Sequence, residues 1–494
     1  MEPCAVLHIA SLHGGGVDRH VRDIVRGVAR RQWIWHAGDT AEVLESPRER
    51  RYLALDPAAV EREGAIVARW LAAQRVGVLH AHSVGGAARR RALGCAAALG
   101  LPTIVTLHDV LFLRPDALDP GVPVEPDPAW LAQTSAFLRS AAAVLAPSDY
   151  IAGLARQYVP GLEVGVVPNG SAPAAGTPGT LEPRPEFGAR RPERVAAVLG
   201  AIGPHKGSRV LEELDGLLAG TGIAIVVIGY LDAQVPPGWR GEHLFIHGPC
   251  QDEELAPLLR AYGARLALFP NRAPESFSYA LSDAWSAGLP ALVPAEGALA
   301  ERVRRHGGGW ILPAGAGARE IAAALVERLG ARGAAELARV ESDLQRPDDS
   351  RVPRADRMSR SLEALYARYG IDADAPLDAR SPDLQALLAR NLDGALFREE
   401  LARLADELVQ LREGLEAERA RFEHEARPWI AKLEADVAAL QSQLAAQVES
   451  RRALGDENFE LRNRNAMLER YKAAFDRLPA IVRRIALKIL HARG

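Results

Sequence analysis

The sequence predicts an α/β protein in which two Rossmann-like, doubly wound domains face a cleft and are followed by an α-helical coiled coil. Three observations support this prediction. The first 370 residues alternate short apolar runs with helical stretches, a Pro-, Gly- and Ala-rich segment at 171–192 separates the runs into two series, and leucines recur at heptad spacing after residue 390. Continuous apolar strands separated by helices are typical of parallel sheets covered on both faces.

Ten apolar runs are the candidate strands, five in each series. The first series comprises 5–10, 76–82, 103–107, 142–146 and 164–167. The second series comprises 195–200, 223–229, 244–248, 265–269 and 291–293. Each series is about the size of one doubly wound domain, so two such domains in tandem would leave a cleft between them.

We therefore divide the chain into seven segments. They are an N-terminal Rossmann-like domain at 1–175, a linker at 176–192, a C-terminal Rossmann-like domain at 193–350, a terminal helix returning to the globular body at 351–370, a second linker at 371–390, a coiled coil at 391–470 and a basic amphipathic tail at 471–494.

The C-terminal segments carry two predictions and two alternatives. Leucines in 3-4 alternation with charges between them favour a coiled coil, which Pro428 should break or kink, and such a coil would make the chain a homo-oligomer. The alternative is a helix packed back on the globular domains. The tail has six Lys or Arg against one Asp among apolar residues, which suits an anionic membrane surface. Its alternative is a helical cap on the coiled coil.

Composition excludes several classes of protein. The net charge of −3 gives no general attraction to nucleic acid. Three cysteines far apart in the sequence argue against a disulfide framework or a zinc site and favour a reducing compartment. No apolar run reaches the roughly 20 residues that span a bilayer, and the N-terminus lacks a basic signal-peptide region. We expect a cytoplasmic protein.

Three short loops of the two series are candidates for binding an anion or a substrate. Gly15 and Gly16 follow the first strand, where glycines let backbone amides approach a phosphate, although a plain tight turn has the same sequence. His108 follows the strand at 103–107, at the edge of the sheet where ligands bind. Lys206, beside His205, could offer a point charge to a phosphate, or it could be an ordinary solvent-exposed lysine.

Two carboxylates flank the start of a predicted helix in the stretch APESFSYALSDAWSAGLP at 273–290. Glu275 lies in the loop and Asp283 lies within the helix. Carboxylates among hydroxyl-bearing residues suit a polyhydroxylated ligand, because they accept hydrogen bonds from its hydroxyls. The helix is mostly apolar and therefore predicted to be buried, so Asp283 needs a partner.

These motifs together resemble the GT-B class of glycosyltransferases, and within it the retaining glycosyltransferase family 4. The resemblance covers residues 4 to about 370. It depends on GGGVDRHV, TLHD, APSDYI, VVPNG, GAIGPHKG and PESFSYALSDAWSAGLP, all in the family's order. The last motif resembles the family's E-x7-E signature, with Glu275 in the first place and Asp283 in the second.

The resemblance implies a role for each candidate residue. The N-terminal domain would lie on the acceptor side, and the C-terminal domain would bind the nucleotide sugar. Glu275 would contact hydroxyls of the donor sugar and Asp283 the ribose of the nucleotide. Lys206 would stabilise the departing diphosphate, and His108 would lie near the reacting carbon. The remaining donor-binding residues would be Gly15, Gly16, His205, Phe277, Ser278 and Tyr279.

The implied reaction needs no metal and no cofactor besides the nucleotide-diphosphate sugar as co-substrate. A hexosyltransferase-type enzyme would move the sugar, with retention, to a glycan or lipid-linked glycan acceptor. The setting would be cell-surface polysaccharide or lipopolysaccharide O-antigen synthesis, with the enzyme peripheral at the inner face of the cytoplasmic membrane.

Two departures from the family pattern leave alternatives open. Ala201 stands where many members have an arginine that helps the lysine hold the diphosphate, and Asp283 is one methylene shorter than the usual glutamate. A non-catalytic oligomeric scaffold carrying a decayed transferase domain is therefore the second hypothesis. A GT-B phosphorylase or epimerase is the third, and the closeness of the Glu275 motif to family 4 argues against it.

Overall fold

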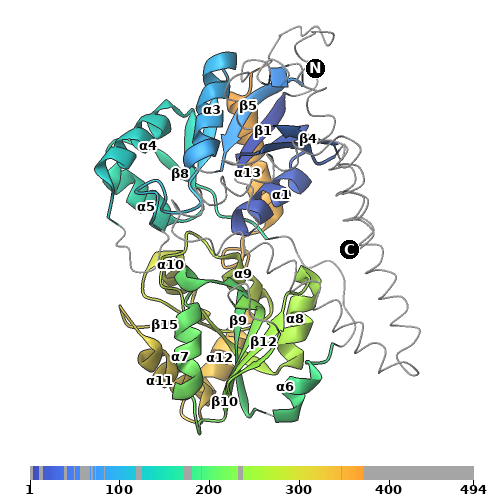
Figure 1. The fold of residues 1–494 in the computed structure, drawn as a ribbon, viewed down its shortest axis with the longest axis vertical. Coiled ribbons are helices and arrows are strands. Elements are labelled where there is room, and N and C mark those ends of the chain that lie inside the picture. The colour runs from blue at the N-terminus through green and yellow to red at the C-terminus, as the bar shows by residue number, and fades with distance from the viewer. Residues whose placement is uncertain are drawn as a thin grey trace, which may run out of the picture.

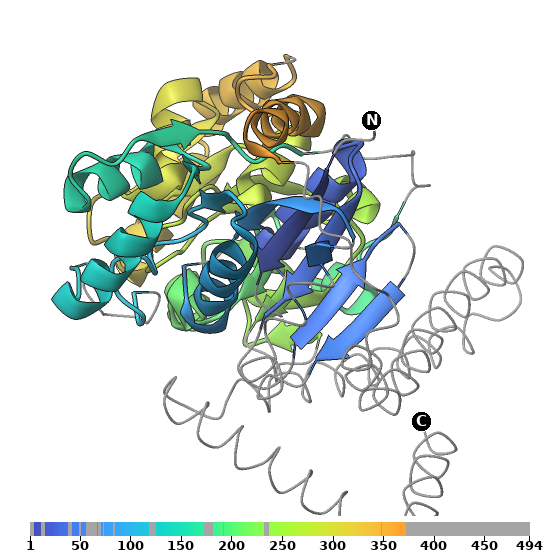
Figure 2. The same ribbon diagram turned by 90° about the horizontal axis from the view of Figure 1, so that it is seen from above.

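The computed structural model describes residues 4–371, except 11–14, 38–41, 49–50, 56–66, 68–70, 73, 83, 118–124, 172–180, 191, 232–236 and 347. The predicted coiled coil at 391–470 and tail at 471–494 lie outside the described residues. The described chain forms two lobes, one above the other in Figure 1, and each contains one sheet. Seen from above in Figure 2, the N-terminal lobe, blue to teal, overlies the C-terminal lobe, green to yellow.

The N-terminal sheet has the strand order β4-β3-β2-β1-β5-β6-β7-β8. The strands from β2 to β8 in that order pair in parallel, whereas β3 and β4 pair antiparallel at one edge. Its strands are β1 (Ala5–Ala10), β2 (Gln32–His36), β3 (Glu42–Ser46), β4 (Arg51–Leu55), β5 (Val76–Ala81), β6 (Thr103–Thr106), β7 (Ala143–Ala146) and β8 (Val164–Val166).

The C-terminal sheet has the order β11-β12-β10-β9-β13-β14-β15. Its strands pair in parallel except β11, which is antiparallel to β12 at the edge. They are β9 (Arg194–Ile202), β10 (Ile223–Leu231), β11 (Gly238–Arg240), β12 (Leu244–Gly248), β13 (Ala264–Leu268), β14 (Ala291–Val293) and β15 (Gly309–Ile311).

All ten strands expected from the sequence are present, with ends within two residues of the expected ones. The sequence analysis missed β2, β3, β4, β11 and β15. The expected parallel sheets are present, but the pairs β2–β3, β3–β4 and β11–β12 at their edges are antiparallel. The edge strands β4, β11 and β15 have one neighbour each, so their sequences need not be the continuous apolar runs on which the prediction depended. Strand β2 is different, because it lies buried between β1 and β3, and its short run QWIWH was missed.

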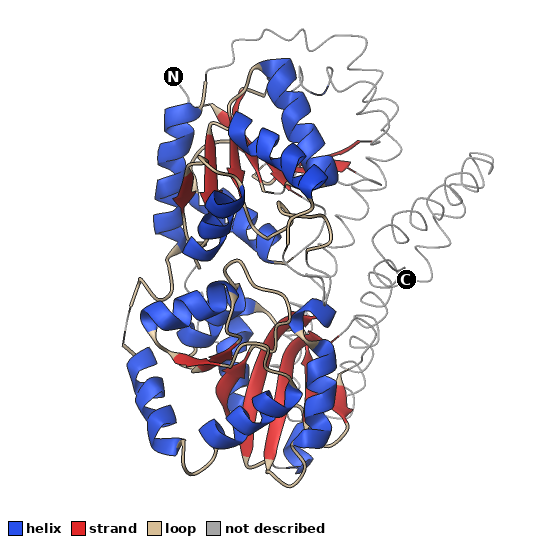
Figure 3. Cartoon of the chain, turned by 90° about the vertical axis from the view of Figure 1, so that its left-hand side faces the viewer, coloured by secondary structure: helices blue, strands red, loops and turns tan. Residues whose placement is uncertain are grey.

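Helices cover both faces of each sheet, as Figure 3 shows. Among the described helices, none combines the length and apolar composition needed to cross a bilayer. They are α1 (Gly16–Gly27), α3 (Gly86–Leu99), α4 (Pro128–Ser140), α5 (Asp149–Tyr158), α6 (Pro185–Arg190), the 3-10 turn η1 (Pro204–Lys206), α7 (Ser208–Leu217), α8 (Asp252–Ala261), α9 (Tyr279–Ser286), α10 (Gly297–His306), α11 (Ala318–Leu329), α12 (Ala334–Leu344) and α13 (Ala355–Tyr369).

Helix α13 returns from the C-terminal lobe to the N-terminal lobe, where it lies beside α1 (orange in Figure 1). Its side chains Met358, Leu362 and Tyr366 are buried in one apolar cluster with residues of β1, β5, β6 and β7. The chain therefore crosses between the lobes twice. Ser171, the last described residue before the first crossing, lies beside the second one: its amide donates to the Pro353 carbonyl (2.8 Å), and its carbonyl accepts from the Ala355 amide (3.1 Å).

A second contact between the lobes joins α5 to α10. Glu301 of α10 accepts hydrogen bonds from the backbone amides of Asp149 (3.1 Å) and Tyr150, in the first turn of α5. Arg305, one turn further along α10, pairs with the Asp149 carboxylate. A carboxylate at a helix N-terminus is favourable because the unpaired amides carry partial positive charge there.

Candidate functional site

The N-termini of helices from opposite lobes meet where the lobes touch. Gly15, at the N-cap of α1, has φ 102°, a left-handed conformation that favours glycine. A Cβ on Gly16 would lie 3.7 Å from Cδ2 of Tyr279, the first residue of α9. Unpaired amides and the helix dipole make a helix N-terminus suitable for binding an anion. This contact brings two such N-termini, those of α1 and α9, close together.

An ion pair joins the same two helices. The Arg19 guanidinium of α1 donates two hydrogen bonds to the Asp283 carboxylate of α9, at 2.8 and 3.0 Å. Arg19 also stacks over the Tyr279 ring, with its Cζ 4.5 Å from the ring centroid. Both charged side chains are about a quarter exposed, at 26% and 22%. The partner that a buried Asp283 requires is therefore an arginine of the other lobe.

Burial governs the charges at this contact. It raises the pKa of Asp283 above its ordinary value, against the opposing effect of Arg19. Burial lowers the pKa of Arg19, but the hydrogen bonds and charge of Asp283 outweigh it, and the net shift is upward. Burial also raises the pKa of Tyr279, whose hydroxyl has no hydrogen-bond partner in the described part of the chain.

Lys206 and Glu275 lie together in the C-terminal lobe. The Lys206 ammonium nitrogen is 3.4 Å from the Glu275 Oε1 atom, and the Asn271 amide donates to the same oxygen at 2.9 Å. The lysine side chain is 35% exposed and the glutamate side chain 20%, so both reach solvent. The Lys206 ammonium therefore remains accessible to a further anion.

Backbone contacts between two loops hold this pair in place. The His205 carbonyl accepts hydrogen bonds from the amides of Arg272 (2.9 Å) and Ala273 (3.0 Å). Gly207 has φ 89°, and a Cβ there would lie 2.1 Å from the Pro270 carbonyl oxygen. Glycine is therefore required for the loop of Lys206 to approach the loop of Glu275 so closely.

Residues 276 to 278 complete the loop before α9. The Ser276 hydroxyl donates to the His108 carbonyl of the other lobe. Ser278 has φ 71°, which costs a non-glycine residue strain energy, and caps α9 by accepting from the Leu281 amide. The buried Arg302 guanidinium donates to the carbonyls of Phe277 (3.1 Å) and Ser278 (2.8 Å). Arg302 thus stabilises the strained segment.

Arg302 is itself unusual, because it is buried without a carboxylate among its hydrogen-bond partners in the described residues. Burial lowers its pKa to about 9. Its guanidinium lies over the Phe277 ring at 4.3 Å from the centroid and donates to the Ser282 hydroxyl and the Arg351 carbonyl. Several neutral acceptors and an aromatic face thus replace a counter-ion.

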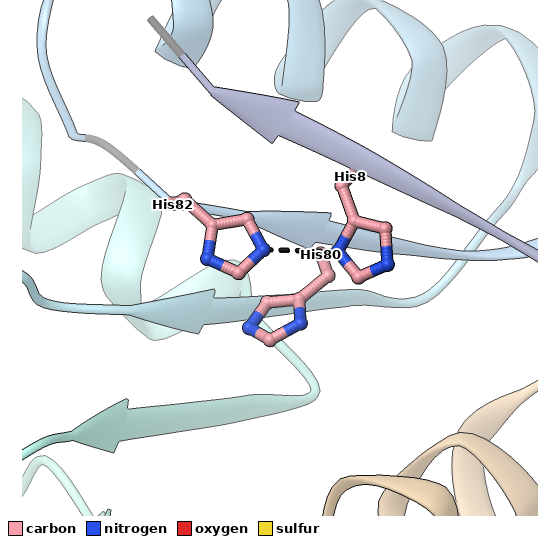
Figure 4. Close-up of side chains that lie close together, drawn as sticks. All are labelled: His8, His80 and His82. Carbon is pink, nitrogen blue, oxygen red and sulfur yellow. Dashed lines mark hydrogen bonds between the residues drawn. The ribbon is translucent and has the colours of Figure 1, made fainter. Parts of the chain in front are cut away.

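The N-terminal lobe contributes five buried histidines. His8 Nδ1 lies 3.0 Å from His82 Nε2, and His82 Nδ1 lies 3.1 Å from His108 Nε2. The His20 ring packs edge-on against His108 with centroids 4.6 Å apart. Figure 4 shows His8, His80 and His82 together, with the bond between His8 and His82 dashed. His108 is thus the end of a buried row of rings that begins inside the sheet.

Comparisons with known proteins agree with this architecture. Among solved structures, sucrose-phosphate synthase from Thermosynechococcus elongatus is similar with a TM-score of 0.55 and 13% identity, covering 74% of this chain and 99% of that one. HepE from Anabaena, in complex with UDP and glucose, gives 0.53 and 14%, covering 74% and 100%. A glycosyltransferase from Rickettsia africae gives 0.52 and 13%, covering 75% and 99%. The chain has the GT-B fold of glycosyltransferases.

The sequence comparison covers part of this GT-B chain. Residues 14–173, which correspond to most of the N-terminal lobe, match the family described as Glycosyltransferase Family 4. No curated protein matches the sequence. The structural likeness therefore extends over both lobes, whereas the family match covers the first.

The GT-B structure places the predicted site residues in one region. A Cβ on Gly16 would touch Tyr279, the Ser276 hydroxyl bonds to the His108 carbonyl, and Lys206 lies beside Glu275. Asp283 also faces the other lobe, but its carboxylate is already paired with Arg19. Phe277 is buried, and its carbonyl is bonded to Arg302. Ala201 is exposed at the end of β9, beside Tyr230 of β10.

The sequence analysis missed several residues of this region. Arg19 lies one turn beyond Gly15 and Gly16, and its partner is 264 positions away. Nothing local marks Arg302 or Asn271. The histidines offered a signal, because residues two apart on a strand share a face, and LHAHS places His80 and His82 in that relation. Their partner His8 lies on the neighbouring strand, opposite His80.

Groups of histidines in the GT-B N-terminal lobe are also close enough to hold a metal ion. One nitrogen from each of His8, His80 and His82 lies within 4.8 Å of the others, and the same is true of His20, His82 and His108. Both ring nitrogens of His8, His80 and His82 already have hydrogen-bond partners. A metal ion in the first group would displace these bonds, so the observed contacts favour a hydrogen-bonded network.

Arg19→Met should destabilise the protein. The substitution keeps the apolar stem but leaves the partly buried Asp283 carboxylate without its partner, and the free energy of unfolding should fall by about 1–3 kcal/mol. Urea unfolding measures this change. Arg357→Met, at an exposed arginine of α13, is the control and should change the value by less than about 0.5 kcal/mol.

Combining Asp283→Asn with Arg19→Met tests whether the two residues stabilise each other or act independently. Because the double variant contains no unpaired carboxylate, its cost should be smaller than the sum of the two single costs. Strict additivity would show that Arg19 and Asp283 do not stabilise each other.

Proposed function

We propose that this chain is a glycosyltransferase that moves a sugar from a nucleotide-diphosphate sugar to a hydroxyl of a glycan acceptor. One observation carries the proposal: the elements expected to hold the donor come from both lobes and meet where the lobes touch. They are the N-termini of α1 and α9, the Lys206–Glu275 pair and His108. The HepE structures, which hold UDP with glucose or UDP-glucose, make a UDP-sugar the first donor to test.

The proposed reaction breaks the bond between the sugar C1 atom and the diphosphate oxygen and forms one between C1 and the acceptor oxygen. Negative charge then develops on the diphosphate. Lys206 and the amides at the two helix ends stabilise it electrostatically, without a metal ion or other cofactor.

We further propose that the anomeric configuration is retained. Glu275 and Asp283, the two carboxylates of the motif, are engaged by Lys206 and Arg19, and so serve as binding groups rather than as a pair for double displacement. The leaving diphosphate would then take the proton of the acceptor hydroxyl. Glu275 would accept hydrogen bonds from donor sugar hydroxyls.

The proposed setting is cell-surface polysaccharide or lipopolysaccharide O-antigen synthesis in the cytoplasm, at the inner face of the membrane. Support comes from the sequence after residue 390, where heptad leucines favour a homo-oligomer and the basic tail favours an anionic surface. Light scattering and vesicle sedimentation, each with the full chain and with a chain ending at residue 390, test these two features.

A cognate donor should stabilise the full-length protein. By mass action, a ligand at 100 times its Kd adds about 2.7 kcal/mol to the free energy of unfolding, which appears as a rise in Tm. Screening UDP-, GDP- and dTDP-sugars by thermal shift, then measuring nucleotide release with and without glycan acceptors, tests the proposal. No shift and no release with any donor would refute it.

Binding without turnover would favour the scaffold hypothesis, in which a decayed transferase domain retains its ligand. The observation behind that alternative is Ala201, exposed at the end of β9 where a second cation would be expected. A product whose sugar stays on phosphate, such as a sugar 1-phosphate or an epimerised donor, would favour a phosphorylase or epimerase. Mass spectrometry of the products distinguishes these cases.

A further inference from the structure

Gln32 of β2 is held in one orientation by the backbone. Its amide nitrogen donates to the carbonyls of Val25 (3.3 Å) and Val28 (3.0 Å), which are acceptors only. The amide oxygen must then be the atom that faces His8, whose Nε2 lies 2.9 Å away. Because an amide oxygen cannot donate, the proton between the two residues belongs to His8 Nε2.

The tautomer of His8 fixes the tautomers of the next two rings, His82 and His108. A neutral imidazole has one N–H and one bare nitrogen, so His8 Nδ1 is bare and accepts from His82 Nε2, 3.0 Å away. His82 Nδ1 is then bare and accepts from His108 Nε2, 3.1 Å away. The remaining nitrogen, His108 Nδ1, is therefore left with its lone pair.

The environment keeps the three rings neutral, as the assignment requires. All three are buried in the described structure, with exposed fractions of 0%, 1% and 8% for His8, His82 and His108. Burial lowers the pKa of His8 to about 4, that of His108 to about 3 and that of His82 well below its usual range. His108 is the most exposed of the three, and its Nδ1 has no hydrogen-bond partner in the described part of the chain.

We propose that Gln32, His8 and His82 are positioning residues that hold His108 as its Nε2–H tautomer and present the Nδ1 lone pair to a sugar hydroxyl. The inference rests on the proposed function, because the hydroxyl is that of the donor sugar or of the acceptor. His108 lies at the end of β6, where its carbonyl bonds to Ser276, the neighbour of Glu275. A ring with the opposite tautomer would offer an N–H at this place instead.

The row does not conduct protons away from the site. A proton accepted at His108 Nδ1 and relayed inward would reach the Gln32 amide oxygen, which is far too weak a base to hold it. Beyond it lie the Val25 and Val28 carbonyls, which are equally weak bases. The row therefore fixes orientation and tautomer, in the way that a second group orients a catalytic histidine through its other nitrogen.

The imidazole 15N spectrum of the wild-type protein tests the tautomers directly. With 15N-labelled histidine, the chemical shifts and couplings to ring protons distinguish a protonated nitrogen from a bare one. His108→Asn removes one signal set and so assigns it. We expect Nε2–H with bare Nδ1 for His108, and a dominant Nδ1–H form would overturn the proposal whatever the activity of the protein.

Gln32→Leu tests the positioning role. Loss of the only acceptor for His8 Nε2 lets the row reverse, so the His108 spectrum should become a mixture of tautomers. The kcat for transfer should fall roughly 10–100-fold with little change in the donor KM, because the hydroxyl is misoriented rather than unbound. Gln32→Glu keeps an acceptor for His8 and should recover part of kcat.

Tyr366→Phe is the matched control. It removes a buried hydrogen bond of 2.6 Å from His80, whose ring lies 4.0 Å from that of His82 but outside the row. The His108 spectrum should stay unchanged and kcat should stay within about twofold. If Gln32→Leu shifts neither the spectrum nor kcat, or Tyr366→Phe shifts both equally, the positioning role is wrong. A wild-type protein with the expected tautomers but no transfer would refute the proposed function alone.

Discussion

Glu275→Ala is expected to lower kcat/KM for sugar transfer by about 10²–10³-fold while the protein stays folded. The carboxylate is partly exposed at the contact between the lobes, and its hydrogen-bond and ionic partners are the Asn271 amide and the Lys206 ammonium. Its backbone position is fixed independently, because the Glu275 carbonyl accepts from the Ala298 amide at 2.8 Å. Steady-state kinetics with the donor found by the thermal screen measures the loss.

Two further variants show which property of Glu275 matters. Glu275→Gln keeps an oxygen for the Asn271 amide but removes the charge beside Lys206, so it isolates the charge. Glu253→Ala, at an exposed glutamate of α8, is the control and should leave kcat/KM unchanged. Full turnover in Glu275→Ala would discard the assignment of the site, and a lowered Tm would mean that the residue supports the fold instead.

Acid should destabilise this protein strongly, because five of its histidines are buried as neutral rings. Burial lowers the pKa of His8 to about 4 and of His108 to about 3, and places those of His20, His80 and His82 well below the usual value. The unfolded chain therefore binds protons that the native state does not, and stability is lost as the pH falls below about 6.5.

The expected size of the effect is large. A ring with a native pKa of about 4 loses about 2 kcal/mol of stabilisation between pH 6.5 and pH 5. His108 contributes a similar amount, and His20, His80 and His82 act in the same direction, so the loss is a large part of the stability of an ordinary domain, about 5–15 kcal/mol. Asp109 acts in the opposite direction, because burial raises its pKa to about 6 and its contribution is lost as the pH rises through that value. Burial also raises the pKa of Asp23, Glu42, Asp283 and Glu301, but neighbouring arginines or backbone amides oppose each of these shifts, so we expect the imidazoles to dominate.

Urea unfolding at pH 7, 6 and 5 measures this dependence, and His20→Phe tests its origin. Both ring nitrogens of His20 are buried without hydrogen-bond partners in the described structure, so an apolar ring should raise stability and flatten the pH profile. His306→Gln, at a partly exposed histidine ending α10, is the comparison variant. Burial lowers the pKa of His306 as well, so this change should flatten the profile, but less than His20→Phe does. A flat wild-type profile from pH 7 to 5 would contradict the prediction.

The central part of the fold could be predicted from the sequence because each central strand is buried on both faces. The segment Val195–Gly200, for example, is a continuous apolar run, and β9 lies there between β10 and β13. In contrast, β11 and β15 have three residues each and form beside a neighbouring strand. The pair β3 and β4 carries charges at Glu42, Glu45 and Arg51, which hide it from a search for apolar runs.

The site was predictable where its chemistry is local in sequence. Glu275 and Lys206 stand in recognisable motifs, and the structure places them 3.4 Å apart. Arg19 and Gln32 escaped prediction because their roles depend on partners in other segments: Asp283 is 264 positions from Arg19, and His8 precedes Gln32 by 24. Such pairings exist only after the chain has folded, so no local pattern signals them.

The return of α13 to the first lobe has a consequence for how the protein is made. The last strand of that lobe, β8, ends at Val166, but Met358, Leu362 and Tyr366, which cover one face of its sheet, follow about 200 residues later. At 5–20 residues per second, a ribosome needs roughly 10–40 s to supply them. During that interval an apolar surface of the nascent lobe stands open, and a chaperone that shields it would raise the yield of soluble protein.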